Sequence, residues 1–288
     1  MTDTRHQRLH LHILGSGSKG NCALVEGPQG MIMIDDGFSR REVLRRMHEL
    51  DVDESRVRAL ILTHEHSDHV SGVTVWCRRF DGELYASAGT CEPRKYLAEL
   101  PFCEFQPGDA LTIAGITVRT FPTSHDVVNP CGFRFELPGA GEQGGERNAA
   151  ADAIGYATDT GVLTPGAMEL LRNVRILALE SNHDVPMLRT GSYPRVLQDR
   201  IIAPTGHLSN AQAAAALPQL VTERTEEVIA MHISQENNRP SLAVRALAEA
   251  VGAALDNELG SSATLTRGNG VPDLHIRAAG QNRPLSVF

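Results

Sequence analysis

The first part of the chain contains short apolar runs of the kind that form β-strands. The segment "LHLHIL" (residues 9–14) alternates apolar and polar positions with a period of two, which predicts a strand. Residues 21–26 form a second run that ends at the turn sequence "GPQG", and "MIMI" (residues 31–34) is typical of a buried strand. The order strand, glycine-rich loop, strand, turn, strand predicts a β-meander.

The pattern further along alternates between strand-like and helix-like segments. Apolar runs predict strands at residues 57–63, 83–86, 110–115, 116–123, 131–138, 153–158, 174–181 and 227–233. Helical spacing predicts helices at residues 39–50, 71–80, 89–100, 164–171, 209–217 and 240–255. No repeat or long linker divides the chain, so we expect one α/β domain over residues 1–288, with two sheets covered by helices. Residues 139–152 are polar and glycine-rich, which predicts a surface insertion, and residues 257–288 form a weakly patterned tail.

Composition narrows the possible classes of function. The 288 residues carry a net charge of −8, which does not support nonspecific electrostatic binding of nucleic acid. Arginine-rich residues 40–46 and 77–80 could form a local basic patch, but solvated helix faces explain them more simply. The five cysteines are odd in number and form no CxxC pair, which favours free thiols in a reducing compartment. With no apolar leader and no segment long enough to span a membrane, we expect a cytoplasmic protein.

The loop "GSGSKG" (residues 15–20) has the glycine spacing of dinucleotide-binding loops. Such a loop needs a following helix whose N-terminus faces the pyrophosphate. Here the next segment is too short for a crossover helix and runs into the turn "GPQG". The glycines are therefore expected to allow a tight turn and a close backbone approach rather than to bind a dinucleotide.

The segment "THEHSDH" (residues 63–69) is the strongest chemical signal in the sequence. It places His64, His66, Asp68 and His69 within six positions, where a buried strand ends and the next helix begins. A rigid element can aim several side chains at one point from such a position. Imidazole and carboxylate ligands suit Zn²⁺, Mn²⁺ or iron, so this segment predicts a metal site.

Other predicted strands also end in a histidine or an aspartate. His125, Asp159 and His232 each follow such a strand. Asp159 is not needed as a helix cap, because Thr164 and Pro165 supply a better cap and first helical residue. Together with the first cluster these residues make seven potential ligands, enough for two metals with one bridging carboxylate.

These residues resemble the five ordered motifs of the metallo-β-lactamase-fold hydrolases, along most of the chain. The resemblance implies a four-layer αββα sandwich with two divalent transition metals, zinc or manganese, at one edge. In that family pattern Asp35 of "MIDDG" orders the loop that carries the ligands. The implied ligand sets are His64, His66 and His125 for one metal, and Asp68, His69 and His232 for the other, with Asp159 bridging.

Three further segments, "GSGSKGN", "GHLSN" (residues 206–210) and "HISQENN" (residues 232–238), are similar to the YycJ/WalJ branch, whose members resemble the nucleases RNase Z and RNase J. The glycine loop would then be an active-site loop, with Ser18 and Asn21 facing the substrate. The chain departs from these nucleases in two ways. It shows no sign of the β-CASP insertion of RNase J or of the long tRNA-gripping arm of RNase Z.

The segment "GHLSNAQ" also has a physical interpretation of its own. Ser209 and Gln212 form a capping-box pattern, so a helix begins here, and His207 lies just before its N-terminus. A helix N-terminus beside a histidine favours the binding of an anion, and phosphate is the natural ligand. A structural role for His207 as a hydrogen-bond donor stays open. His183 could line the site, or it could only form hydrogen bonds within its loop.

The expected activity is a metal-dependent phosphodiesterase or nuclease, exonuclease-like, with nucleic acid as substrate. Water shared by two metals ionises near neutral pH and would attack phosphorus. Asp68 would orient this nucleophile or move its proton, and His207 would hold the phosphate or protonate the leaving oxygen. A carbon-centred hydrolase of the thioesterase, lactonase or β-lactamase type is the main alternative. A di-iron redox protein is less favoured because that class has glutamate where this chain has His66. A non-catalytic regulatory module is less favoured because the ligand set is complete.

Overall fold

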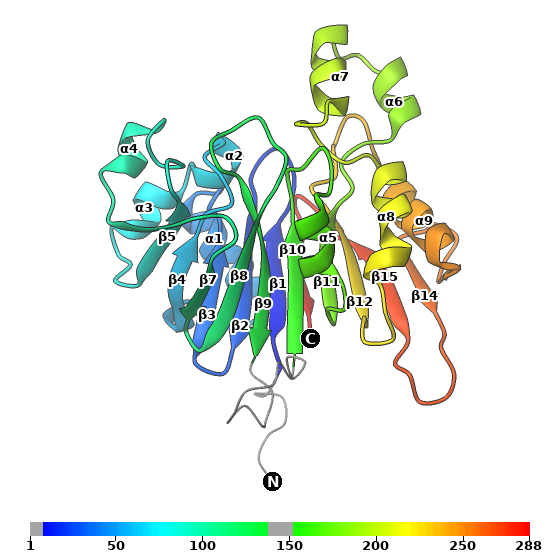
Figure 1. Ribbon diagram of the computed structural model, residues 1–288, viewed down its shortest axis with the longest axis horizontal. Helices are drawn as coiled ribbons and strands as arrows, with labels where there is room; N and C mark the ends of the chain where they lie inside the picture. The colour runs from blue at the N-terminus through cyan, green and yellow to red at the C-terminus, as the bar shows by residue number, and fades with distance from the viewer. Residues whose placement is uncertain (1–7, 138–151) are drawn as a thin grey trace.

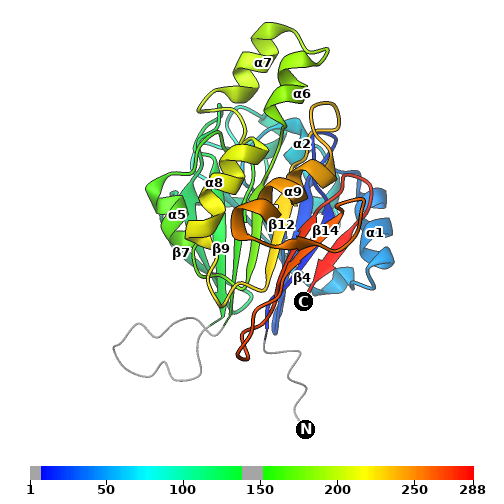
Figure 2. The same cartoon turned by 90° about the vertical axis from the view of Figure 1, so that its right-hand side faces the viewer.

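The computed structural model describes residues 8–137 and 152–288. Two β-sheets pack face to face, and helices cover the outer face of each (Figure 1, Figure 2). One apolar cluster fills the space between the sheets, and two others lie between each sheet and its helices. This layering confirms the predicted αββα sandwich.

Among the described residues the first sheet has seven strands, in the spatial order β16-β1-β2-β3-β4-β5-β6. Their bounds are β16 (Leu285–Val287), β1 (His10–Gly15), β2 (Cys22–Gly27), β3 (Gly30–Ile34), β4 (Val57–Ile61), β5 (Glu83–Ser87) and β6 (Phe102–Phe105). The first three strands pair antiparallel, which confirms the predicted meander. The glycine loop therefore joins two antiparallel strands and no helix follows it, as expected.

The second sheet has nine strands in the described part of the chain, in the order β13-β14-β15-β12-β11-β10-β9-β8-β7. They are β7 (Ala110–Ile113), β8 (Ile116–Pro122), β9 (Cys131–Leu137), β10 (Asp152–Ala157), β11 (Ile176–Glu180), β12 (Glu227–Met231), β13 (Ala254–Leu255), β14 (Ser262–Leu265) and β15 (Leu274–Ala278). β9 pairs antiparallel with both β8 and β10, and β10, β11 and β12 are parallel. β8, β10, β11 and β12 consequently all end at the same edge of the sheet.

The helices fall into three groups. The first sheet is accompanied by α1 (Arg40–Glu49), α2 (Ser67–Val70), α3 (Val73–Cys77), α4 (Lys95–Ala98) and the 3₁₀ turn η2 (Glu54–Arg56). The second sheet is covered by α5 (Pro165–Leu171), α8 (Asn210–Leu220) and α9 (Pro240–Val251). The pair α6 (Val185–Thr190) and α7 (Arg195–Ile202) projects beyond the sandwich (Figure 1, Figure 2). No helix in the described ranges is long and apolar enough to cross a membrane.

Several predicted elements differ from the observed ones. The helix predicted at residues 71–80 is shortened to α3. It is separated from α2 at Gly72, where the loop of Phe38 packs so closely that a Cβ would lie 1.9 Å from the Phe38 carbonyl oxygen. The helix predicted at residues 89–100 is reduced to α4. β6, α6 and α7 were not predicted, and the weakly patterned tail forms β14, β15 and β16. Apart from Asp152, which begins β10, the predicted insertion at residues 139–152 lies outside the described residues.

The arginine-rich helix α1 is only partly a solvated face. Arg45 is exposed and pairs with Glu42 and Glu49. Arg46 is buried and donates from Nη1 to the carbonyl oxygens of Leu14 and Gln281, both at 2.7 Å. This guanidinium therefore holds the helix to the sheet and is not available to a partner.

Candidate metal centre

The predicted ligands converge at the edge where the strands of the second sheet end. His125 follows β8, Asp159 follows β10 and His232 follows β12. The "THEHSDH" loop reaches them from β4 of the first sheet, because the Cys131 N–H at the start of β9 donates to the Thr63 carbonyl at 3.0 Å. Residues from four separate segments of the chain thus meet at one place.

The first implied ligand set is assembled around three histidines. The ligand atoms of His64, His66 and His125 all lie within 4.8 Å of one another. His66 Nδ1 is 3.2 Å from His125 Nε2. His64 Nδ1 contacts the Thr63 hydroxyl at 3.0 Å, and its buried Nε2 has no hydrogen-bond partner. A buried ring nitrogen without a partner needs an explanation, and a cation bound among these imidazoles would supply one.

The second implied set lies beside the first. The ligand atoms of Asp68, His69 and His232 are also within 4.8 Å of one another, and His232 Nε2 is a second buried nitrogen without a partner. Asp159 lies between the two sets, with Oδ2 at 3.3 Å from His69 Nε2 and Oδ1 at 3.8 Å from His125 Nε2. The donor set of imidazoles and carboxylates therefore fits two divalent cations with Asp159 between them.

Two residues hold the ligand loop in place. Asp35 accepts from the Thr63 N–H at 2.8 Å and the Thr63 hydroxyl at 2.7 Å, and its Oδ2 lies 2.7 Å from His69 Nδ1. This leaves Nε2 as the ring nitrogen of His69 that faces the site. The Asn21 amide reaches Asp68 Oδ2 at 3.2 Å and His69 Nε2 at 3.0 Å. Asn21 is buried, so in this structure it positions ligands, whereas we expected it to face the substrate.

Glu180 is a residue of the site that the sequence analysis missed. It is fully buried at the end of β11 and its Oε1 lies 2.9 Å from both His207 Nδ1 and His232 Nδ1. Its Oε2 accepts from the N–H groups of Thr160 and Leu208. The signal that identified the other candidates, a polar residue at the end of a buried strand, is also present at Glu180.

The charges of the site act strongly on one another. Burial alone would raise the pKa of Asp159, but His232 and His69 outweigh it and hold this pKa well below its ordinary value. Burial lowers the pKa of His64, whereas at His69 it is outweighed by Asp159 and Asp35, which raise that pKa. At His232, burial is outweighed by Asp159, Asp68 and Glu180 together, and the pKa rises to about 10. Protons held on His69 and His232 would have to leave when a metal binds.

The backbone is strained at three of these positions. Asp35, Asp159 and His232 have φ values of 57°, 49° and 51°, in the left-handed region that non-glycine residues seldom adopt. Such conformations persist where the surroundings enforce them, and they gather at functional sites. Each of the three directly follows or closely follows the end of a strand, so the sharp turn aims its side chain into the cluster.

A cavity of about 260 Å³ opens above the cluster. His66, Asp68, His125, Asp159, His207 and His232 line its floor together with Ser18 of the glycine loop. Tyr193, Leu197, Arg200 and Ile201, from α7 and the segment before it, form a wall that the sequence analysis did not anticipate. Arg200 pairs with Asp126 at 2.6 Å across the rim.

The segment around His207 differs from the expectation in one respect. Ser209 caps α8 through a complete capping box with Gln212, as predicted. However, the N–H groups of Leu208, Ser209 and Asn210 already donate to Glu180, Gln212 and His183. These donors are not available to a phosphate, so an anion-binding role would rest on the His207 side chain. Ser209 and His183 are buried and do not line the cavity.

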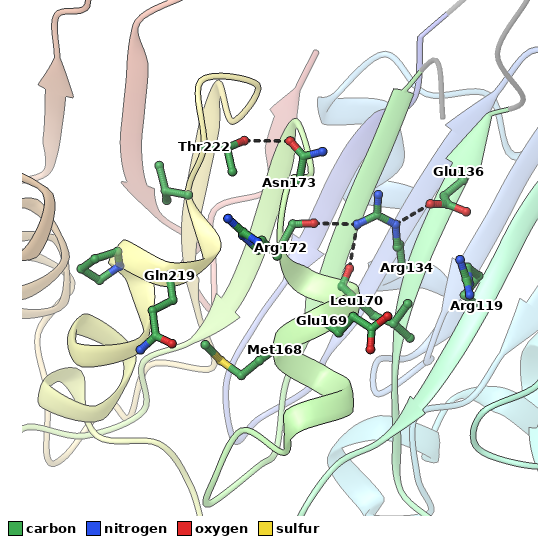
Figure 3. A pocket seen from close by; sticks show the side chains of 12 residues that line it. Arg119, Arg134, Glu136, Met168, Glu169, Leu170, Arg172, Asn173, Gln219 and Thr222 are labelled. Carbon is green, nitrogen blue, oxygen red and sulfur yellow. Dashed lines mark hydrogen bonds and ion pairs between the residues drawn. The ribbon is translucent and has the colours of Figure 1, made fainter. Parts of the chain in front are cut away.

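A larger hollow, of about 980 Å³, lies elsewhere on the molecule (Figure 3). It is formed by β8, β9 and the C-terminal ends of α5 and α8, and it contains none of the predicted ligands. Its Arg134 donates to the carbonyl oxygens of Leu170 and Arg172, both at 2.8 Å, and pairs with Glu136. That arginine caps the end of α5, so the larger hollow has a structural explanation and the smaller one carries the chemistry.

Comparisons with known proteins agree with this geometry. Residues 31–233 match the family model described as "Beta-lactamase superfamily domain". The chain is 33% identical over 241 residues to Exodeoxyribonuclease YycJ of Bacillus anthracis, covering 82% of this chain and 86% of that protein. It is also 33% identical to Exodeoxyribonuclease WalJ of Streptococcus pneumoniae, covering 80% and 84%.

Solved structures support the fold independently of sequence. Zinc-bound PqqB of Methylobacterium extorquens matches with a TM-score of 0.65 and 13% identity, covering 97% of this chain and 99% of that one. A diphosphatase of the PhnP family matches with a TM-score of 0.61 and 17% identity, covering 98% of both chains. Family match, relatives and geometry lead to one conclusion: the chain belongs to the metallo-β-lactamase superfamily.

Proposed function

We propose that this protein is a metal-dependent hydrolase of phosphodiester bonds in nucleic acid, acting as an exonuclease. The observation that carries the proposal is the pair of adjacent ligand sets, joined by Asp159, at the floor of a cavity. The two relatives described above are exodeoxyribonucleases by name, which supports DNA as the first substrate to test.

His64, His66 and His125 would hold one cation, and Asp68, His69 and His232 the other, with Asp159 shared. Zinc or manganese suits this mixture of imidazole and carboxylate ligands. Bound there, two such cations supply an activated water and Lewis acidity that stabilises charge on phosphorus.

Two side chains are placed to move protons or orient the substrate. Burial opposes ionisation of Asp68, but the neighbouring His232 and His69 lower its pKa, so Asp68 is a carboxylate that can orient the attacking water or accept its proton. His207 offers Nδ1 to Glu180, which leaves Nε2 available to protonate the leaving oxygen or to hold a phosphate oxygen.

The cavity favours a single nucleotide at a chain end. At about 260 Å³ it is smaller than most pockets for drug-sized ligands, which begin at about 300 Å³. Tyr193 supplies an aromatic surface in the wall opposite the ligands, and base stacking on such a ring tolerates any sequence. A cavity of this volume can take the terminal nucleotide of a strand but not an extended duplex, which supports exonucleolytic rather than internal cleavage.

The test combines a metal assay with a substrate panel. Protein reconstituted with zinc or with manganese is offered end-labelled single- and double-stranded DNA and RNA, a thioester and a β-lactam. We expect stepwise release of nucleotides, abolished in Asp68→Ala and retained in Asp81→Ala, a change at an exposed aspartate. Preferential hydrolysis of the thioester or the β-lactam would overturn the proposal and favour a carbon-centred hydrolase.

We also propose that the chain forms one domain and works in a reducing compartment. The single-domain proposal is supported by the pairing of β16 with β1, which ties the end of the described chain to its beginning. The compartment proposal is supported by the five cysteines, all of which are free in this structure.

A further inference from the structure

A second group of potential metal ligands lies on the outer face of the first sheet. The "LHLHIL" pattern places Leu11 and Ile13 in the core between the sheets, so His10 and His12 point to the opposite face. Glu26 on β2 is the direct cross-strand partner of His10. The ligand atoms of these three side chains lie within 4.8 Å of one another.

The group is separate from the candidate metal centre. His10 precedes Ser16 by six residues of strand and loop, and the Ser16 hydroxyl accepts from the His232 N–H at 2.8 Å. At roughly 3.3 Å per residue, this places His10 about 20 Å along the strand from the site edge. None of the three residues belongs to the ligand sets described above.

The spacing of the three ligand atoms suits a tetrahedral cation. Glu26 Oε2 lies 3.0 Å from His12 Nε2 and 3.7 Å from His10 Nδ1. Metal–ligand bonds of about 2.0–2.1 Å at tetrahedral angles separate neighbouring ligand atoms by about 3.3 Å. The ligands of the candidate metal centre show the same range, with His66 and His125 at 3.2 Å and Asp68 and His232 at 3.8 Å.

The surroundings orient each ligand toward the common point. The Ser286 hydroxyl of β16 lies 2.7 Å from His12 Nδ1, which turns Nε2 toward Glu26. Arg56 binds the other carboxylate oxygen of Glu26 and leaves Oε2 facing the histidines. The Phe288 ring packs edge-on against both imidazoles, with centroids 5.1 and 6.1 Å away. His12 is 3% exposed, while His10 and Glu26 keep side-chain exposures of 17% and 20%, so an ion can enter from solvent.

We propose that His10, His12 and Glu26 form a third metal site, which binds Zn²⁺ with two imidazoles and one carboxylate and joins β1 to β2. Nitrogen ligands in this number favour zinc over calcium or magnesium, which prefer oxygen. Water would occupy the fourth position of the tetrahedron, and the site does not depend on the proposed hydrolytic activity.

The test is zinc content per chain after dialysis of the purified full-length protein against micromolar zinc. We expect His10→Gln and Glu26→Gln each to hold one zinc fewer than the wild type, with nucleotide release unchanged. His48→Gln, a change at an exposed histidine of α1, serves as the matched control and should keep the wild-type content. Added zinc should raise the melting temperature of the wild type by more than that of His10→Gln.

Both variants change partly exposed side chains at nearly constant volume, so the fold should survive, and circular dichroism checks this. Equal zinc content in wild type, His10→Gln and Glu26→Gln would show that the three residues form only an ion-pair cluster, and the proposal would be wrong. Loss of hydrolysis without loss of zinc would bear on the proposed function instead, so the two failures are distinguishable.

Discussion

Replacing Glu180 with glutamine tests whether this buried carboxylate fixes the ring orientation of His232. Glu180 Oε2 accepts from two backbone N–H groups, at 2.9 Å from Thr160 and 3.1 Å from Leu208. These donors cannot turn away, so the single amide oxygen of a glutamine would have to face them. The amide NH₂ would then face His207 Nδ1 and His232 Nδ1, where Glu180 Oε1 now lies at 2.9 Å from both.

This exchange reverses the direction of the hydrogen bond to His232. An NH₂ group can only donate, so His232 Nδ1 would have to accept and the ring proton would move to Nε2. Nε2 is the orphaned nitrogen that faces Asp68 in the second ligand set, and a protonated nitrogen cannot bind a metal. Losing a partner that orients a metal ligand typically weakens metal affinity or activity by about 10- to 100-fold, which corresponds to about 1.4–2.7 kcal/mol.

The assay is competition with a chromogenic chelator for zinc, together with nucleotide release from labelled DNA. We expect Glu180→Gln to lose about 10- to 100-fold in affinity for one of its cations, and activity to fall in parallel. Glu227→Gln, on the neighbouring strand β12 and paired with Arg277, is the matched control and should behave like the wild type. Wild-type affinity and turnover in Glu180→Gln would refute the assignment of this carboxylate.

Four further outcomes are expected. Asp68→Ala should abolish hydrolysis while the chain keeps its circular dichroism spectrum, because this side chain lies on the short helix α2 and belongs to none of the apolar clusters; near-wild-type turnover would exclude a catalytic role. His207→Ala should lower phosphodiester hydrolysis by about 10²–10⁴ with little change in metal content; loss of metal would instead make His207 a ligand. Tyr193→Ala should raise KM for single-stranded DNA at least about fivefold, as loss of a base-stacking contact does, whereas Tyr96→Ala, at an exposed tyrosine of α4, should not. Because the pKa of His232 is raised to about 10, its proton stabilises the metal-free fold fully below about pH 6.5, and this stabilisation is lost as pH rises toward 10. Denaturant titrations at pH 7 and pH 9 should therefore show a loss of stability in the metal-free protein and none in the metal-loaded protein.

The sequence was most informative where strands end in ligands. The spacing of His64, His66, Asp68 and His69 forms a local pattern, and His125 and Asp159 follow strands whose apolar runs are unmistakable. Glu180 is the last residue of a strand of the same kind. It was missed because a lone glutamate at a strand end is common, and only the fold shows that two histidines share its oxygen.

Other parts of the structure had no local signal to detect. Tyr193 and Arg200 line the cavity because of the path of the chain through α6 and α7, which no local sequence pattern indicates. The strands of the tail depend on partners far away in the sequence, such as the pairing of Ser286 with His12. The engaged N–H groups before α8 likewise depend on Glu180 and His183, which no spacing within "GHLSN" could indicate.

The pairing of β16 with β1 has a consequence for how the protein is made. The two strands join residues separated by 274 positions, so this contact has a very high contact order. During synthesis β1 leaves the ribosome early, and its outer edge stays an unpaired hydrogen-bonding template until residues 285–287 emerge. Slowed translation or removal of residues 285–288 should therefore promote edge-to-edge aggregation of nascent chains, even though both changes leave every predicted metal ligand intact.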